Sequence, residues 1–161
     1  MSNTTEPANS PSDIEARFVS GAIGRDLGLS ADELHFGLVV ARNHMMRGAR
    51  LEALRIYTAL VICDPMNVEF QIGLANCALQ IGENHLALQS ASVIAALEPQ
   101  NPKGYYFSGR ACLGLRHLAE AEEDLREAQA LARASGDAIV HRECEKLISL
   151  AKMLRERDAG A

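Results

Sequence analysis

Histidine and cysteine are the residues of this sequence best suited to hold a metal ion. A metal site needs several such side chains converging on one point, commonly from closely spaced pairs such as Cys-x-x-Cys. No Cys-x-x-Cys pair occurs, and no two histidines lie three or four positions apart on one predicted helix. We therefore expect no metal site among the dispersed histidines, which are His35, His44, His85, His117 and His141.

The sequence also lacks motifs of catalysis. His141 and Glu145 are four residues apart, which we interpret as a solvated contact rather than an acid–base couple. The glycines between Gly104 and Gly109 follow no predicted strand and have no lysine after them, unlike a phosphate-binding loop. No motif locates a nucleophilic serine. We expect neither enzyme activity nor a cofactor.

Composition limits the compartment and the partners. The four cysteines, Cys63, Cys77, Cys112 and Cys144, are widely spaced, which is typical of small buried hydrophobic residues in a reducing compartment. A net charge of −5 without a basic stripe disfavours nucleic acid. No basic segment leads into an apolar stretch at the N-terminus, and no window approaches the ~18 apolar residues of a membrane span. These features predict a soluble cytoplasmic protein of one domain, without direct membrane insertion.

One pattern is written three times between Leu34 and Arg133, at a spacing of 34 residues. The recurring positions are Ala41, Ala75 and Gly109; Ala53, Ala87 and Ala121; Gly48 and Gly82; and Pro65 and Pro99. In the third copy, Arg116 and Arg133 replace the glycine and the proline of the earlier copies. This period, with small residues where helices touch, resembles the tetratricopeptide repeat, a helix-turn-helix unit.

The resemblance predicts an all-α fold in which three repeats form a curved right-handed superhelix. Ser30 with Glu33 is a capping box, and Asn67 and Asn101 are N-cap candidates. After Asp137, an apolar stripe with a charged opposite face predicts a capping helix that closes residues 30–161. The expected repeat helices span 31–47, 50–63, 68–81, 84–97, 102–115 and 118–134.

The N-terminal segment is predicted to be separate from the repeats. Residues 1–11 are polar and predict a disordered tail, and residues 12–29 predict a short helix and a linker. Ile14, Phe18 and Ala22 lie on one apolar helical face, too small to be stable alone. That face needs a surface to cover, either the body of the same chain or a second copy of it. These three residues are therefore the candidates for dimerisation.

In the family pattern, residues 2, 5, 9 and 12 of each repeat point into a concave groove. Apolar and polar rows alternate there, which suits an extended peptide. The nine candidate peptide-binding residues are Leu38, Arg42 and Met45; Ile72, Asn76 and Leu79; and Tyr106, Arg110 and Leu113, with His35, Glu69 and Lys103 at position 2.

The chain size, the order of the elements and four short segments point to one branch of the repeat family. The segments are Met46-Arg-Gly-Ala-Arg-Leu-Glu-Ala53, Cys63-Asp-Pro, Phe70-Gln-Ile-Gly-Leu-Ala75 and Leu118-Ala-Glu-Ala-Glu122. Together these features resemble the class II or translocator chaperones of bacterial type III secretion systems.

The resemblance implies a chaperone that binds hydrophobic translocator proteins in the bacterial cytoplasm before export. Such proteins hold a segment of the client in the concave groove, and many form homodimers through the N-terminal region. The family's aromatic-rich pocket maps onto Leu38, Arg42 and Met45 here.

Two other functions stay open: a generic repeat adaptor, and a structural or regulatory subunit of a secretion assembly. Repeat domains that clamp a C-terminal carboxylate use Lys and Asn at groove positions. Leu38, Gly73 and Phe107 occupy three of those places here, which argues against a clamp.

Overall fold

The structure is a computed structural model that describes residue 24 and residues 26–160. Every regular element within these residues is a helix, which confirms the predicted all-α class. The predicted tail, the predicted N-terminal helix and its residues Ile14, Phe18 and Ala22 lie outside the described residues. The helices are α3 (Ala31–Met46), α4 (Arg50–Cys63), α5 (Val68–Ile81), α6 (Asn84–Leu97), α7 (Pro102–Gly114), α8 (Leu118–Ser135) and α9 (Ala138–Ala159).

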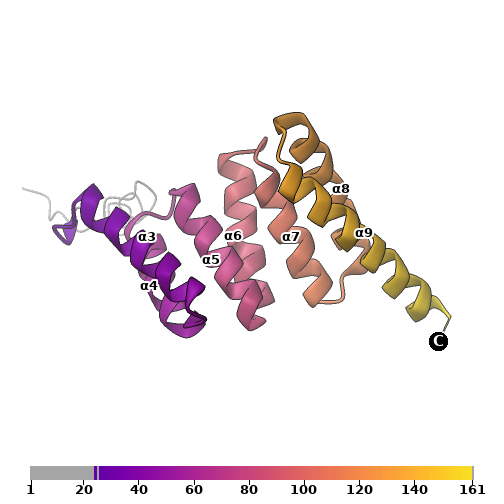
Figure 1. Cartoon of the computed structure of the whole chain (residues 1–161), viewed down its shortest axis with the longest axis horizontal. Coiled ribbons are helices and arrows are strands. Elements are labelled where there is room, and N and C mark those ends of the chain that lie inside the picture. The colour runs from indigo at the N-terminus through magenta and orange to yellow at the C-terminus, as the bar shows by residue number, and fades with distance from the viewer. Residues whose placement is uncertain (1–23, 25, 161) are drawn as a thin grey trace, which may run out of the picture.

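The helices stack in sequence order along the long axis of the molecule (Figure 1). Helices α3 and α4, α5 and α6, and α7 and α8 form three neighbouring pairs, and α9 packs against α8 and α7. The C-terminal turns of α9 extend beyond the preceding pair (Figure 1). This is the predicted tetratricopeptide array with a closing helix.

Side-chain caps explain where the first helix of each pair begins. The Ser30 hydroxyl accepts from the backbone N–H of Glu33, whose carboxylate accepts from the backbone N–H of Ser30. Asn67 caps α5 by accepting from the N–H groups of residues 69 and 70, and Asn101 caps α7 in the same way at residue 103. The predicted caps are confirmed, because each side-chain oxygen satisfies N–H groups that have no partner within the helix.

The turn between the two helices of a pair contains a left-handed glycine in the first two repeats but an arginine in the third. Gly48 and Gly82 adopt positive φ angles of 77° and 83°. Arg116, at the corresponding place, adopts φ 66°, a left-handed conformation that costs energy for a residue with a Cβ. Its guanidinium donates two hydrogen bonds to the carboxylate of Asp158 near the end of α9, at 2.6 and 2.8 Å. The third turn therefore keeps the shape of the other two without a glycine.

The core is built from small residues at helix crossings and branched residues between them. Ala41, Ala75, Ala53, Ala87 and Ala121 are all fully buried. Their small side chains let helix axes approach closely, as ridges-into-grooves packing requires. The largest fully buried side chains, which fill the space around these crossings, are Leu38, Ile94, Leu125, Cys77 and Cys144.

Candidate functional site

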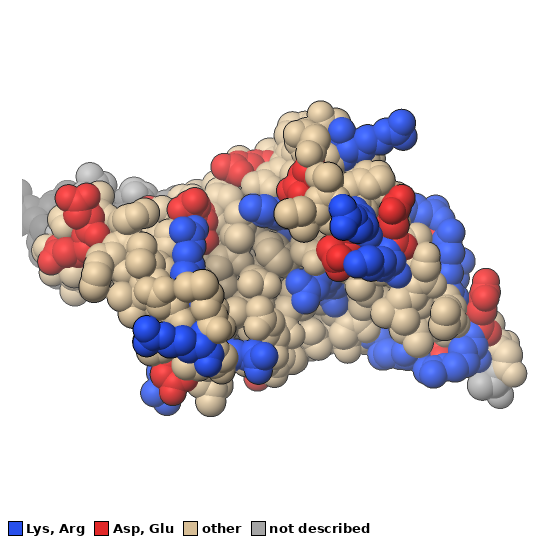
Figure 2. Space-filling view, in the orientation of Figure 1, with Lys and Arg blue, Asp and Glu red and all other residues tan. Residues whose placement is uncertain are grey.

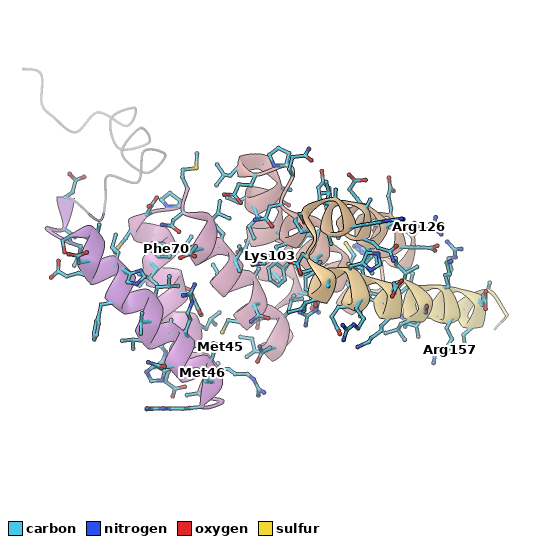
Figure 3. All side chains as sticks on the ribbon, turned by 45° about the horizontal axis from the view of Figure 1, so that its top comes forward. Met45, Met46, Phe70, Lys103, Arg126 and Arg157 are labelled. Carbon is cyan, nitrogen blue, oxygen red and sulfur yellow. The ribbon has the colours of Figure 1, made fainter. Side chains whose placement is uncertain are left out.

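A hollow of about 380 Å³ opens where the first helices of the three repeats face one another. Helix α3 contributes its last turns, with Met45 and Met46 at that end of the helix (Figure 3). The lining comes from α3 (Arg42, Met45, Met46), α4 (Tyr57), α5 (Glu69, Ile72, Gly73, Asn76) and α7 (Phe107). We call this hollow the groove pocket.

The ring of Tyr57 reaches the groove pocket because α5 has no side chain at Gly73. A Cβ built on Gly73 would lie 2.0 Å from ring carbon Cε1 of Tyr57, well inside van der Waals contact. Tyr57 is buried, and burial raises the pKa of its hydroxyl, against a smaller lowering by Arg42. The ring and Phe107 supply aromatic walls from α4 and α7.

Polar groups stand at the rim of these apolar walls. Arg42 and Glu69 approach to 3.7 Å across α3 and α5, with exposed side-chain fractions of 52% and 63%. Asn76 also lines the pocket, and its amide makes no side-chain hydrogen bond with another described residue. An apolar cavity beside a free amide and an exposed ion pair can hold one apolar side chain and bond the backbone next to it.

Four of the nine predicted groove residues line this pocket: Arg42, Met45, Ile72 and Asn76. They come from the first two repeats, on α3 and α5. The first two repeats therefore contribute all four of the predicted residues that line the groove pocket.

The prediction that Leu38 offers a binding surface is wrong. Its side chain is 1% exposed and packs in the core cluster of the first repeat, which also contains Ala41, Tyr57 and Phe70. Leu38 lies one turn before Ala41, on the side of α3 that faces α4 and α5. The residue therefore belongs to the core.

The third repeat uses its groove-facing residues within the molecule. Tyr106 and Leu113 are partly buried against the cluster formed by α8 and α9. The guanidinium of Arg110 lies over the Tyr106 ring, 5.3 Å from its centroid. Leu79, from the second repeat, packs between the second and third repeats. The closing helix packs against this part of the predicted groove, because α9 contacts α7 as well as α8 and Tyr106 and Leu113 are partly buried against it.

Met46, Tyr57, Gly73 and Phe107 line the pocket but were not among the predicted site residues. A signal for Tyr57, Gly73 and Phe107 exists in the repeat alignment. Tyr57 aligns with Ala91 at 34 residues, and Gly73 aligns with Phe107. At the junction between the first and second repeats, the large Tyr57 faces a glycine. At the junction between the second and third repeats, the equivalent positions hold Ala91 and Phe107, which pack in one core cluster.

One group of possible metal ligands exists in the described part of the chain, although none was expected. Ligand atoms of Cys112, His117 and Glu120 lie within 4.8 Å of one another at the α7–α8 turn. His117 is the N-cap residue of α8, and its Nδ1 lies 3.3 Å from the Glu120 carboxylate in the first turn. Carboxylates are favourable at helix N-termini, so the turn itself accounts for this grouping.

None of the described helices has the length and apolar character needed to cross a lipid bilayer.

In sequence, the chain matches known proteins of two different kinds. The chain is 35% identical over 95 residues to cellulose synthase operon protein C of Pseudomonas fluorescens, covering 7% of that protein. It is 30% identical over 103 residues to low calcium response locus protein H of Yersinia pestis, covering 64% of this chain and 61% of that protein. The chain thus spans less than two thirds of either relative. No family model matches it.

Solved structures match over most of the chain. A type III secretion complex from Aeromonas hydrophila gives a TM-score of 0.78 at 27% identity, covering 91% of this chain and 99% of that one. The translocator chaperone SycD of Yersinia enterocolitica, in an alternative dimer, gives 0.72 at 25% identity, covering 79% and 97%.

PcrH, crystallised with the chaperone-binding region of PopD, gives a TM-score of 0.73 at 26% identity, covering 80% of this chain and 97% of that one. The resemblance predicted from the repeat pattern is thereby confirmed: in fold and in sequence this chain is similar to the translocator chaperones of type III secretion.

Proposed function

We propose that the chain is a secretion chaperone that binds an extended segment of a hydrophobic translocator protein. The client is held in the bacterial cytoplasm, soluble and unassembled, before export. The chain does this without enzyme activity. PcrH and SycD, which share its fold, have been crystallised with translocator segments of PopD and YopD.

The groove pocket is the observation that supports this function most directly. We propose that Met45, Ile72, Tyr57 and Phe107 surround one apolar client side chain. Burying such a side chain yields about 1.5–3 kcal/mol, and association consumes part of it. The Asn76 amide can bond the client backbone, and Arg42 can pair with an acidic client residue. One anchor alone is weak, so client segments must also contact the rim.

The proposal includes a homodimer formed through the N-terminal region. Its basis is the apolar face of Ile14, Phe18 and Ala22 in the sequence and the dimer seen for SycD. Deleting residues 1–29 should lower the mass measured by light scattering. An unchanged mass would remove the dimer from the proposal and leave the groove untouched.

Co-expression with a translocator from the same host tests the chaperone function. The wild-type chain should keep the translocator in the soluble fraction, whereas Met46→Glu should not, because it places a charge at the pocket rim. Met153→Glu is the matched control, since Met153 is an exposed methionine on α9. Equal solubility with the wild-type chain and with Met46→Glu would reject the groove pocket as the client site.

A protein–protein adaptor is the second candidate, because the chain is also similar to cellulose synthase operon protein C, whose name is not that of a chaperone. That relative is similar over 95 residues, a span comparable to the repeats alone. The same co-expression separates the two functions. An adaptor should bind its partner while leaving the partner's solubility unchanged.

A further inference from the structure

A second and larger hollow, of about 850 Å³, lies between α8 and α9, away from the groove pocket. Its walls are the C-terminal half of α8, the turn at Gly136 and the first two turns of α9. Basic residues dominate the charged part of the lining. The residues are Arg126, Gln129, Ala130, Ala132, Arg133, Gly136, Ala138, His141, Arg142 and Glu145. We call it the arginine hollow.

Two of its three arginines have no carboxylate partner within the described part of the chain. Neither Arg133 nor Arg142 forms an ion pair with a described residue, and both are exposed. Arg126 enters from α8 (Figure 3) and pairs with Glu122, a buried residue whose other oxygen lies 3.0 Å from the Arg155 guanidinium. Glu122 therefore pairs with two guanidinium groups, and its single negative charge does not neutralise the arginine hollow.

Glu145 is the one carboxylate among the described residues that line the arginine hollow. The lining thus carries three guanidinium groups against one acid, in a chain whose net charge is −5. Figure 2 shows basic side chains gathered over the part of the molecule formed by α8 and α9. Like charges facing one hollow repel one another, and an anion placed between them removes that repulsion.

We propose that the arginine hollow binds an acidic segment of a partner protein, at a site separate from the groove pocket. Guanidinium groups bind carboxylates through two parallel hydrogen bonds, and several such groups can grip successive Asp or Glu residues. The volume is in the range of sites that hold small ligands, so a few residues of a peptide fit. The N-terminus of α9 is not the anion site, because Asp137 already caps it.

Fluorescence anisotropy tests the proposal with the full chain and a labelled peptide of alternating Glu and Ser. The control peptide replaces each Glu with Gln. The chain should bind the acidic peptide at low salt and bind it more weakly as salt rises, since exposed charges are screened. Arg133→Glu with Arg142→Glu should weaken binding at least tenfold.

The matched control is Arg47→Glu with Arg55→Glu, which makes the same change of net charge on exposed arginines of the first repeat. This control variant should weaken binding of the acidic peptide by less than about threefold, because it changes only the net charge. Circular dichroism checks that both variants fold, and Arg133→Gln with Arg142→Gln serves if charge reversal unfolds the chain. Equal binding by the two pairs of variants, or equal binding of the Gln peptide, would overturn the proposal. Tighter binding of a polyphosphate or an RNA oligomer than of the acidic peptide would also overturn it.

Discussion

Tyr57 lies against the backbone of Gly73, so closely that a Cβ on Gly73 would come within 2.0 Å of the ring. This contact joins the second helix of the first repeat to the first helix of the next. It also forms part of the groove pocket, which both residues line. The missing side chain of one residue makes room for the ring of the other.

Gly73→Ala should destabilise the protein, although alanine favours a helix over glycine by about 1 kcal/mol. The new methyl group cannot enter without moving the buried Tyr57 ring, and such overpacking costs about 1–3 kcal/mol. Urea unfolding measures the difference. Gly37→Ala is the control, since its Cβ would meet only the tip of Leu60, at 3.1 Å, and should change stability by less than about 1 kcal/mol. A Gly73→Ala variant as stable as the wild type would show that Tyr57 has room to move.

Leu38→Glu should unfold the first repeat, because Leu38 is 1% exposed. Removing a buried leucine side chain costs about 2–5 kcal/mol, and the buried charge adds to this. Met46→Glu should change stability by less than about 0.5 kcal/mol, because Met46 is 78% exposed. Thermal unfolding followed by circular dichroism compares the two. If Leu38→Glu kept the wild-type melting temperature, the core position of Leu38 would be wrong.

Arg116→Gly should leave stability nearly unchanged or raise it by up to about 1 kcal/mol. Glycine relieves the left-handed strain at φ 66°, worth about 1–2 kcal/mol, and the lost ion pair with Asp158 is exposed and worth about 0–1 kcal/mol. Arg47→Gly provides the contrast, because Arg47 has φ −85° and no such strain, so glycine should destabilise there. Chemical unfolding of both variants and of Asp158→Ala separates strain from ion pairing. A larger loss in Arg116→Gly than in Arg47→Gly would contradict this account.

Asp124→Asn should stabilise the protein at pH 7. Burial raises the pKa of Asp124, and the Ser108 hydroxyl, which donates to its carboxylate at 2.6 Å, partly offsets that rise. The charged carboxylate therefore costs stability in the folded state at neutral pH. The cost disappears as pH falls through the folded pKa towards the ordinary value near 3.9. Urea unfolding between pH 7 and pH 3.5 should show the advantage of Asn shrinking.

Ser108→Ala sharpens this test, because it removes the hydrogen bond that favours the charged carboxylate. That variant should be less stable than the wild type at pH 7, with a smaller difference at pH 3.5. An Asp124→Asn advantage that does not change with pH would mean that burial of the charge is not its cause.

Local signals were enough to predict most of the fold. The expected helices 50–63, 68–81 and 84–97 match α4, α5 and α6 at both ends. Their boundaries are set by nearby residues, such as the cap at Asn67 and the turn at Gly82. The other three expected helices start at the predicted residue and deviate by one residue at the C-terminal end, since α3 stops at Met46, α7 stops at Gly114 and α8 runs to Ser135. Arg133 does not interrupt a helix as proline would.

The candidate site was less accessible from the sequence, because groove exposure depends on contacts between distant segments. A periodic pattern places Leu38 and Tyr106 at equivalent positions. It does not say that Leu38 packs under α4 and α5, or that the closing helix packs over Tyr106. Comparing Tyr57 with its repeat equivalent Ala91, and Gly73 with its equivalent Phe107, would have indicated the aromatic walls of the groove pocket.

The large and small residues change places between the two repeat junctions, with Tyr57 against Gly73 at the first and Ala91 with Phe107 at the second. The repeats are therefore not interchangeable building blocks. Asn67 and Asn101 begin equivalent helices, so a duplicated segment 68–101 would join the chain smoothly at the backbone. Its new junction, however, would set Ala91 opposite a copied Gly73, two small residues with no ring between them. Each unit is therefore matched to its own neighbour, and lengthening this array would require a compensating aromatic residue at the new seam.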